Sequence, residues 1–346
     1  MDRAGPRVPS WLVDYSLLAG VALAVASGLA SLVSRPGDAW LFVLHGGAGV
    51  SLVAFLALKL WRVRHRVRAG VRARSGRVAL SVVLSLVAVA ALATGIAWVL
   101  GATVPGPWTL LFVHASLGVV TAVVLLVHLR DRLSLPARAD LRERRAALSW
   151  LGLTAAGAVA YRVTDAVGTE RRFTGSRERG SDAGNRFPVT AWVADDPDPV
   201  DPDEWTLTVT GLVEREFELD YGSVRPETEA RALLDCTSGW YSEHDWQGVR
   251  VDELLDEAGV GENAAWVQFR SVTGYRWSLP LAEAREALLA TAVDGERLSH
   301  GHGFPLRLVA PERRGFQWVK WVEEVRVTRR RDRSEWVAIN VSGLGE

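Results

Sequence analysis

Four apolar stretches dominate the amino-terminal part of the chain, and each is long enough to cross a lipid bilayer. They cover approximately residues 11–34, 39–61, 78–101 and 107–129. A helix needs roughly 20 apolar residues to span about 30 Å of hydrocarbon. The sequence therefore predicts an integral membrane protein whose residues 1–145 form an all-α membrane bundle, and it excludes a wholly soluble or disordered chain.

A fifth stretch, residues 146–167, is less apolar and contains Arg162 near its end. We expect it to form a further transmembrane helix. Arg144 and Arg145 precede it and resemble a twin-arginine export signal. Positive charge beside a membrane span explains the same residues more simply. The export signal gains support only if the following domain must acquire a cofactor in the cytoplasm.

Arginine is concentrated in alternate loops. Seven arginines lie in residues 62–77 and six in residues 130–145, whereas the loops 34–38 and 101–107 carry little charge. Because basic loops stay in the cytoplasm, we expect a multi-pass protein of the cell membrane with a cytoplasmic amino terminus and an extracytoplasmic carboxy-terminal domain. The arginine runs serve this topology and predict no nucleic-acid partner.

The membrane half contains an internal repeat. The sequence LFVLHGGAGV at 41–50 aligns with LLFVHASLGV at 110–119 and superposes His45 on His114. This pattern predicts a duplicated helical hairpin. It places the two histidines at equal depth on two helices that run in the same direction.

Two imidazoles that face each other inside a membrane are the ligands that a b-type haem iron requires. The alternative is a hydrogen-bonded histidine pair in a tight helix interface. We expect a haem b held by His45 and His114, and no second haem, since His128 aligns with Lys59. Small residues beside the pair are expected to leave room for the macrocycle: Gly46, Gly47, Gly49, Ala115, Ser116 and Gly118.

The second half of the chain has a different composition. Residues 1–166 contain 18 basic and 7 acidic side chains, a net charge of +11, whereas residues 167–346 have a net charge of −11. Residues 168–186 are polar and rich in Gly and Ser, which is typical of a linker. Residues 187–346 are long enough for one domain. Short alternating runs predict an α+β domain dominated by strands, with helices at 251–259 and 281–290.

Two rare residues stand out in this domain. Cys236 is the only cysteine of the chain, and Lys320 is the only lysine beyond the membrane half. A lone cysteine is a buried apolar residue, a nucleophile served by His244, His300 or His302, or a thiolate ligand for a soft metal. In a chain that uses arginine almost everywhere, a retained lysine near Arg307 and His302 predicts a small anion site.

Several motifs of residues 187–328 resemble the molybdopterin domain of the sulfite oxidase family. They are WTLTVTGLV (205–213), LLDCTSGW followed by WQGV (233–249), SVTGYRWSLPL (271–281) and HGFPLRLVAPERRGFQWVKWVEEV (302–325). The resemblance implies a strand-rich domain of the sulfite oxidase type that binds a molybdenum–molybdopterin cofactor. A cofactor that is inserted in the cytoplasm also favours the twin-arginine interpretation.

The resemblance also implies roles for individual residues. Cys236 matches the cysteine whose thiolate binds molybdenum, and His302, Arg307 and Lys320 match residues that hold the pterin and its phosphate. The segment 316–319, which includes Gln317, matches one that runs beside the pterin. Phe187 matches the first stretch that contacts the cofactor.

Two departures point away from sulfite as the substrate. Tyr241 stands where sulfite oxidases have an arginine that helps to bind sulfite, and Gly315-Phe316-Gln317 is closer to the branch of the periplasmic methionine sulfoxide reductase catalytic subunit. We therefore expect two-electron oxo transfer on a small substrate, with S-oxide or N-oxide reduction favoured over oxidation of a sulfur compound. Electrons would pass through haem b to or from a quinone pool or another membrane carrier. The alternatives are a non-catalytic membrane sensor or assembly protein and a hydrolase that uses Cys236.

Overall fold

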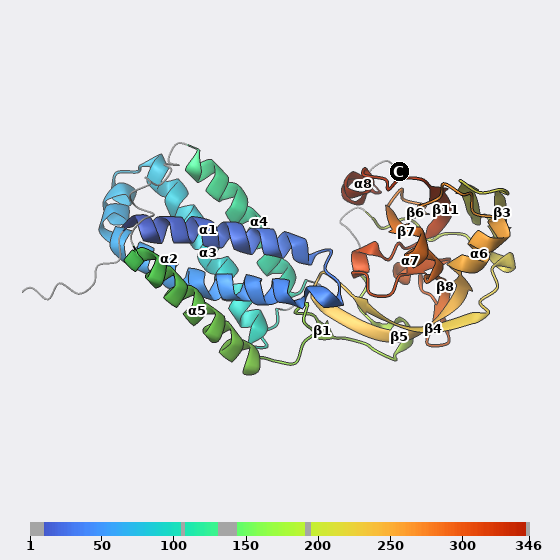
Figure 1. Ribbon diagram of the computed structural model, residues 1–346, viewed down its shortest axis with the longest axis horizontal. Coiled ribbons are helices and arrows are strands. Elements are labelled where there is room, and N and C mark those ends of the chain that lie inside the picture. Colours follow the sequence, from blue (N-terminus) through green and yellow to red (C-terminus); the bar gives the residue numbers. More distant parts are fainter. Residues whose placement is uncertain (1–9, 105–107, 131–143, 191–194, 344–346) are drawn as a thin grey trace, which may run out of the picture. The chain divides into compact units, whose positions relative to one another are not determined.

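The computed structural model describes residues 10–104, 108–130, 144–190 and 195–343. It divides into two compact units, Met1–Gly175 and Ser176–Glu346 (Figure 1). The first unit is helical and the second is built mainly from strands, as the sequence predicts.

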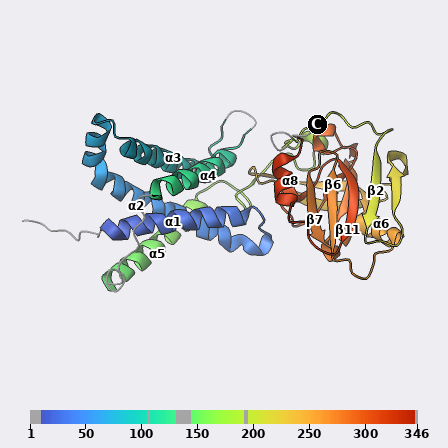
Figure 2. The same ribbon diagram turned by 90° about the horizontal axis from the view of Figure 1, so that it is seen from above.

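The helical unit consists of two antiparallel hairpins and one further helix. Within each hairpin the two helices pack against each other, α1 on α2 and α3 on α4, and α5 packs against α2 (Figure 2). This arrangement confirms the duplicated hairpin. The helices are α1 (Ser10–Ser31), α2 (Ala39–Arg72), α3 (Gly76–Val99), α4 (Leu110–Leu129) and α5 (Arg144–Ala166).

Among the described residues, four helical segments are long and apolar enough to cross a membrane, and they include α1 to α4. Helix α2 continues to Arg72, so much of the arginine-rich segment 62–77 is helical rather than a loop. Helix α5 forms where a fifth span is predicted, but its crossing of the membrane stays a prediction. Residues 131–143 and the side chains of Arg144 and Arg145, on which the twin-arginine interpretation depends, lie outside the described part of the chain.

The second unit contains two sheets. In the six-stranded sheet the order is β1-β5-β8-β10, with β4 also beside β5 and β9 beside β8. Its strands are β1 (Arg177–Glu178), β4 (Thr228–Asp235), β5 (Trp240–Arg250), β8 (Leu288–Val293), β9 (Glu296–Arg297) and β10 (Arg307–Val309). The five-stranded sheet has the order β3-β2-β11-β6-β7. Its strands are β2 (Thr206–Gly211), β3 (Phe217–Asp220), β6 (Trp266–Ser271), β7 (Arg276–Pro280) and β11 (Val322–Thr328).

Three short helices accompany the sheets: α6 (Val251–Ala258), α7 (Leu281–Arg285) and α8 (Glu335–Val341). The predicted helix at 281–290 is wrong beyond Arg285, because the following apolar residues form β8 between β5 and β10. An apolar run of this length does not distinguish a buried strand from a helix. The predicted linker 168–186 also differs from the structure, since β1 pairs with β5 and Ser176 is buried.

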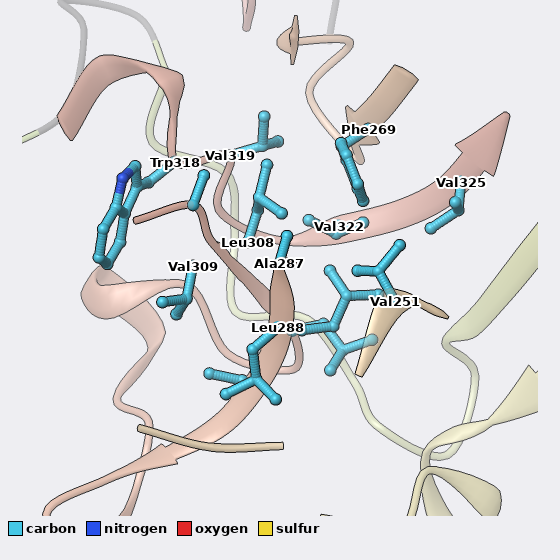
Figure 3. Close-up of a cluster of buried hydrophobic side chains, with 14 of the residues drawn as sticks. Val251, Phe269, Ala287, Leu288, Leu308, Val309, Trp318, Val319, Val322 and Val325 are labelled. Atoms are coloured by element: carbon cyan, nitrogen blue, oxygen red, sulfur yellow. The ribbon is translucent and has the colours of Figure 1, made fainter. Parts of the chain in front are cut away.

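The core of this unit lies between the two sheets. Figure 3 shows Leu288, Leu308 and Val309 from the six-stranded sheet near Phe269 and Val322 from the five-stranded sheet. All five are at most 3% exposed. Burial of such a side chain contributes about 1.5–3 kcal/mol to the stability of the fold. This layer therefore stabilises the two sheets, whose strand ends carry the loops of the candidate site.

Candidate active site and histidine pair

Cys236 lies in the tight turn between β4 and β5. Its amide donates to the carbonyl of Trp240 (2.9 Å), and its own carbonyl accepts the amide of Gly239 (3.1 Å). Gly239 has a φ of 98°, which favours glycine. The turn holds a side chain that is 7% exposed, with the Ser238 hydroxyl 3.0 Å from Sγ.

A buried ion pair supports this turn from behind. The guanidinium of Arg314 lies 3.1 Å from the Asp235 carboxylate and donates to the Cys236 carbonyl (3.3 Å). Ser176 donates to Asp235 as well (2.7 Å). A Cβ on Gly315 would lie 3.1 Å from the Cys236 Cα atom, so the segment after Arg314 packs directly on the cysteine. Sequence reasoning missed Arg314, Asp235 and Ser176.

The predicted cofactor-binding residues His302, Arg307 and Lys320 lie together. Arg307 donates to the His302 carbonyl (2.8 Å), and Lys320 donates to the Gly301 carbonyl (3.1 Å). Gly303 allows this approach: it has a φ of 108°, and a Cβ there would meet both Lys320 and Arg307 at 3.1–3.2 Å. A larger residue at this position would separate the two cations.

Phe187 lies against the histidine of this cluster. Its ring centroid is 4.0 Å from that of His302, and its carbonyl accepts a hydrogen bond from His302 Nε2 (2.9 Å). The Ser299 hydroxyl lies 2.7 Å from Nδ1 of the same ring. Since a carbonyl only accepts, Nε2 carries the proton. Burial lowers the pKa of His302 to about 4, so the ring is neutral near pH 7 and Nδ1 then accepts from Ser299.

Burial lowers the pKa values of all three basic groups. Burial lowers the pKa of Arg307 to about 10. Burial, and next the charge of Arg307, lower the pKa of Lys320 to about 8. Burial is also the main cause that lowers the pKa of His302 to about 4. Asp195, Asp196 and then Cys236 act in the opposite direction on Lys320, and Cys236 does so on Arg307. The cluster thus concentrates positive charge that an anion would stabilise.

Buried donors without partners lie in the same region. In the described part of the chain, Arg307 Nε, Gln317 Nε2 and Trp318 Nε1 are buried and have no hydrogen-bond partner. Gln317 uses its Oε1 to accept the amide of Arg314 (3.0 Å), which leaves its amide group as a donor. Unsatisfied buried donors are costly. A ligand with several acceptor atoms and negative charge, such as a pterin phosphate, fits this donor set.

The helical unit brings together the two predicted haem ligands. The rings of His45 and His114 have centroids 5.8 Å apart and are nearly perpendicular, with an interplanar angle of 88°. His45 Nδ1 lies 2.9 Å from the carbonyl of Ala24, and His114 Nδ1 lies 2.8 Å from that of Ala91. Among the described residues, neither Nε2 has a hydrogen-bond partner. Each Nε2 is therefore free of competing hydrogen bonds in this part of the chain.

The small residues near the pair have two different roles. A Cβ on Gly46 would fall 1.9 Å from the Tyr161 ring, so Gly46 serves the packing of α5 on α2 and leaves no room for a macrocycle. Gly49 and Gly118 each lie one turn after a histidine, and a Cβ on either would meet nothing within 4 Å. The room expected for a macrocycle therefore stays a prediction, and these two repeat-related glycines are the positions where the surroundings are open.

Comparison with known proteins identifies the strand-rich unit. The family model for the oxidoreductase molybdopterin binding domain matches residues 194–336. The uncharacterized oxidoreductase YuiH of Bacillus subtilis is 35% identical over 155 residues, which cover 43% of this chain and 78% of that protein. The chain belongs to this family. Its carboxy-terminal unit is a molybdopterin binding domain, and the cationic cluster beside Cys236 lies within it.

Two further relatives are covered less completely. The protein-methionine-sulfoxide reductase catalytic subunit MsrP of Gluconobacter oxydans is 31% identical over 39% of this chain and 50% of its own length. The putative protein-methionine-sulfoxide reductase subunit YedZ1 of Azospira oryzae is 29% identical over 41% of this chain and 56% of its own length. The chain thus spans about half the length of these two relatives.

The pKa of Lys320 predicts how the cofactor-free molybdopterin binding domain holds an anion. Lys320 binds an anion in its charged form, and deprotonation through about pH 8 removes that charge. We expect the affinity for inorganic phosphate to be highest below pH 8 and to fall about tenfold per pH unit above it. Calorimetric titration of cofactor-free protein between pH 7 and 9.5 measures this slope.

The control for this titration is Lys320→Arg. An arginine at this position stays charged in the same range, so the variant is expected to lose the inflection near pH 8. A wild-type affinity that does not change between pH 7 and 9.5 would contradict the assignment of Lys320 to the anion site.

Proposed function

We propose that the chain is a membrane-bound molybdenum-dependent oxidoreductase that reduces S-oxides or N-oxides with electrons delivered through a membrane haem b. The observation that carries the catalytic half of this proposal is the group of Arg307, Lys320 and unpartnered buried donors next to Cys236. This group fits a phosphorylated pterin with a metal at the cysteine. Oxidation of a small sulfur compound is the reverse direction at the same site.

The residues of the site have distinct tasks in this proposal. Cys236 would provide a thiolate ligand, and molybdenum supplies two-electron oxo transfer when bound. Arg307 and Lys320 would hold the phosphate, while Gln317 and Trp318 would donate to the pterin. Phe187 and His302 pack beside them and exclude water. Arg314 and Asp235 hold the turn that carries the cysteine.

The net reaction uses two electrons and two protons for each oxygen atom that is removed. An S-oxide gains two electrons and two protons, its S–O bond breaks, and a thioether and water leave. Tyr241 in place of the sulfite-binding arginine supports this direction, as does the similarity to a methionine sulfoxide reductase catalytic subunit. A quinol in the membrane would supply the electrons, which the haem would pass singly.

The structure offers less support for the alternatives. In the described residues, the hydrogen-bond partner of Cys236 Sγ is the Ser238 hydroxyl, and no histidine lies within hydrogen-bond distance to act as a base for hydrolysis. A sensor without chemistry would have no need for buried cations and donors that lack partners, since each lowers stability.

Metal and haem analysis of the full chain in detergent tests the proposal. We expect about one molybdenum atom and one haem b per chain when the host makes the pterin cofactor, and turnover of a small S-oxide with a quinol donor. Folded protein without molybdenum from such a host would refute the catalytic half. Folded protein with molybdenum and no haem would refute only the electron-transfer half.

A further inference from the structure

The helices that precede the two histidine helices share a five-residue pattern. Residues 24–28 read Ala-Val-Ala-Ser-Gly in α1, and residues 91–95 read Ala-Leu-Ala-Thr-Gly in α3. Ala24 precedes His45 by 21 positions, whereas Ala91 precedes His114 by 23. The pattern is therefore shifted by two positions between the hairpins, which hides it in an ungapped alignment that superposes the histidines.

The first alanine of each pattern fixes the proton on a histidine ring. The carbonyls of Ala24 and Ala91 lie 2.9 and 2.8 Å from Nδ1 of His45 and His114. A helix carbonyl has a second lone pair beyond its bond to the amide four residues later. Because a carbonyl only accepts, both Nδ1 atoms must carry the proton. In a neutral imidazole this leaves both Nε2 atoms as metal donors.

The glycine of each pattern makes this approach possible. A Cβ on Gly95 would lie 2.9 Å from both Cε1 and Nδ1 of His114, and a Cβ on Gly28 would lie 3.3 Å from Cε1 of His45. Contacts as short as that at Gly95 force a shift, because protein interiors are already packed to near-crystalline density. Any side chain at Gly95 must therefore displace the ring or break its bond to Ala91.

The two half-sites differ in one further contact. The Ser27 hydroxyl lies 3.2 Å from His45 Nδ1 and also bonds to carbonyls of its own helix. The Thr94 hydroxyl bonds to the carbonyls of Ala90 and Ala91 and, among the described residues, makes no hydrogen bond to His114. The contact at Gly95 is shorter than that at Gly28, and His114 Nδ1 has one hydrogen-bond partner among the described residues where His45 Nδ1 has two. We therefore expect substitution of Gly95 to disturb its histidine more than substitution of Gly28 does.

We propose that the two Ala-x-Ala-(Ser/Thr)-Gly segments are positioning elements that orient His45 and His114 with Nε2 toward one iron. The inference rests on the proposed haem b and adds the residues that set its ligand geometry. Glycine and alanine also allow close packing of membrane helices without any ligand. Such packing explains the small residues. It does not explain why the carbonyls of Ala24 and Ala91 both accept from Nδ1, the ring nitrogen that does not bind iron when Nε2 is the ligand.

Substitution of the glycines in the full chain tests the proposal. We expect Gly95→Ala to lower haem affinity by about 10-fold or more, the effect typical of removing an outer partner of a metal ligand. Gly28→Ala should fold and keep its haem, because its contact of 3.3 Å is longer than the 2.9 Å at Gly95. In this variant we expect a shifted midpoint potential and altered low-spin electron paramagnetic resonance signals.

Gly20→Ala is the matched control. A Cβ on Gly20 in α1 would lie 2.8 Å from the Leu52 side chain, about as close as the contact at Gly95, but it faces no histidine. This variant has the same change in helix propensity and a similar packing strain. We expect it to retain the haem affinity, potential and spectrum of the wild type.

The outcomes separate the two proposals. In one outcome the wild-type chain binds haem, and Gly95→Ala and Gly28→Ala show the same haem affinity, midpoint potential and spectrum as the wild type. This result would overturn the positioning role and leave the haem site standing. Changes in Gly20→Ala equal to those in Gly28→Ala would overturn it as well, since general packing would then explain them. A folded wild-type chain without haem would overturn both the haem site and its positioning elements.

Discussion

Replacing Cys236 with serine is expected to reduce oxo-transfer turnover by more than about 100-fold while the protein still folds and retains its pterin. Changes to outer partners of a metal already lower activity by about 10- to 100-fold, and Cys236→Ser alters the proposed ligand itself. A hydroxyl is a much poorer donor to a soft metal than a thiolate. Serine is close to cysteine in size, so the contact with Gly315 should survive.

Three measurements on Cys236→Ser separate ligand loss from misfolding: turnover with an S-oxide, molybdenum per chain, and pterin released on denaturation. We expect the pterin to remain, because Arg307 and Lys320 are unchanged. Ser238→Ala is the comparison variant, since it removes the partner of Sγ at 3.0 Å and keeps the thiolate. The turnover of Ser238→Ala should fall far less than that of Cys236→Ser. Wild-type turnover in Cys236→Ser would remove the cysteine from the metal site.

Substitution of either paired histidine is expected to abolish the low-spin haem. In His45→Ala and in His114→Ala one of the two Nε2 donors is lost, so the iron would be five-coordinate or absent. Quinol-driven reduction of the S-oxide should fall to background. Turnover with a soluble reduced dye should persist, because the molybdopterin binding domain has its own core.

His128→Ala is the control for the histidine pair. His128 lies in the last turn of α4 and its repeat partner is Lys59, so it should not ligate the haem. Absorption and electron paramagnetic resonance spectra of the three variants measure the outcome. A bis-imidazole signal that survives in His114→Ala would show that the pair does not hold the iron.

The features that sequence reasoning could predict are those with a repeated or rare signal. The apolar runs predict α1 to α4 because hydrophobicity and length alone set a membrane span. Cys236 and Lys320 stand out because each is the only residue of its type in its half of the chain. Their neighbours in the site then follow from family motifs, and the structure places these residues together.

The features that sequence reasoning missed depend on contacts between distant segments. Arg314 is one of 38 arginines, and only the approach of the segment after β10 to the turn after β4 makes it a partner of Asp235. The run Leu288–Val293 forms a strand because β5 and β10 flank it. Gly46 was expected beside a haem but lies under Tyr161, which no local pattern indicates.

Each helical hairpin contains one complete half of the histidine site. The bond from His45 to Ala24 joins α1 and α2, and the bond from His114 to Ala91 joins α3 and α4. One hairpin therefore sets the tautomer of its own ligand without help from the other. Two identical hairpins related by a two-fold axis along the membrane normal would present the same pair of rings. A single hairpin of this kind therefore contains every group that one half of the site needs, and pairing two copies would be enough to assemble the histidine pair.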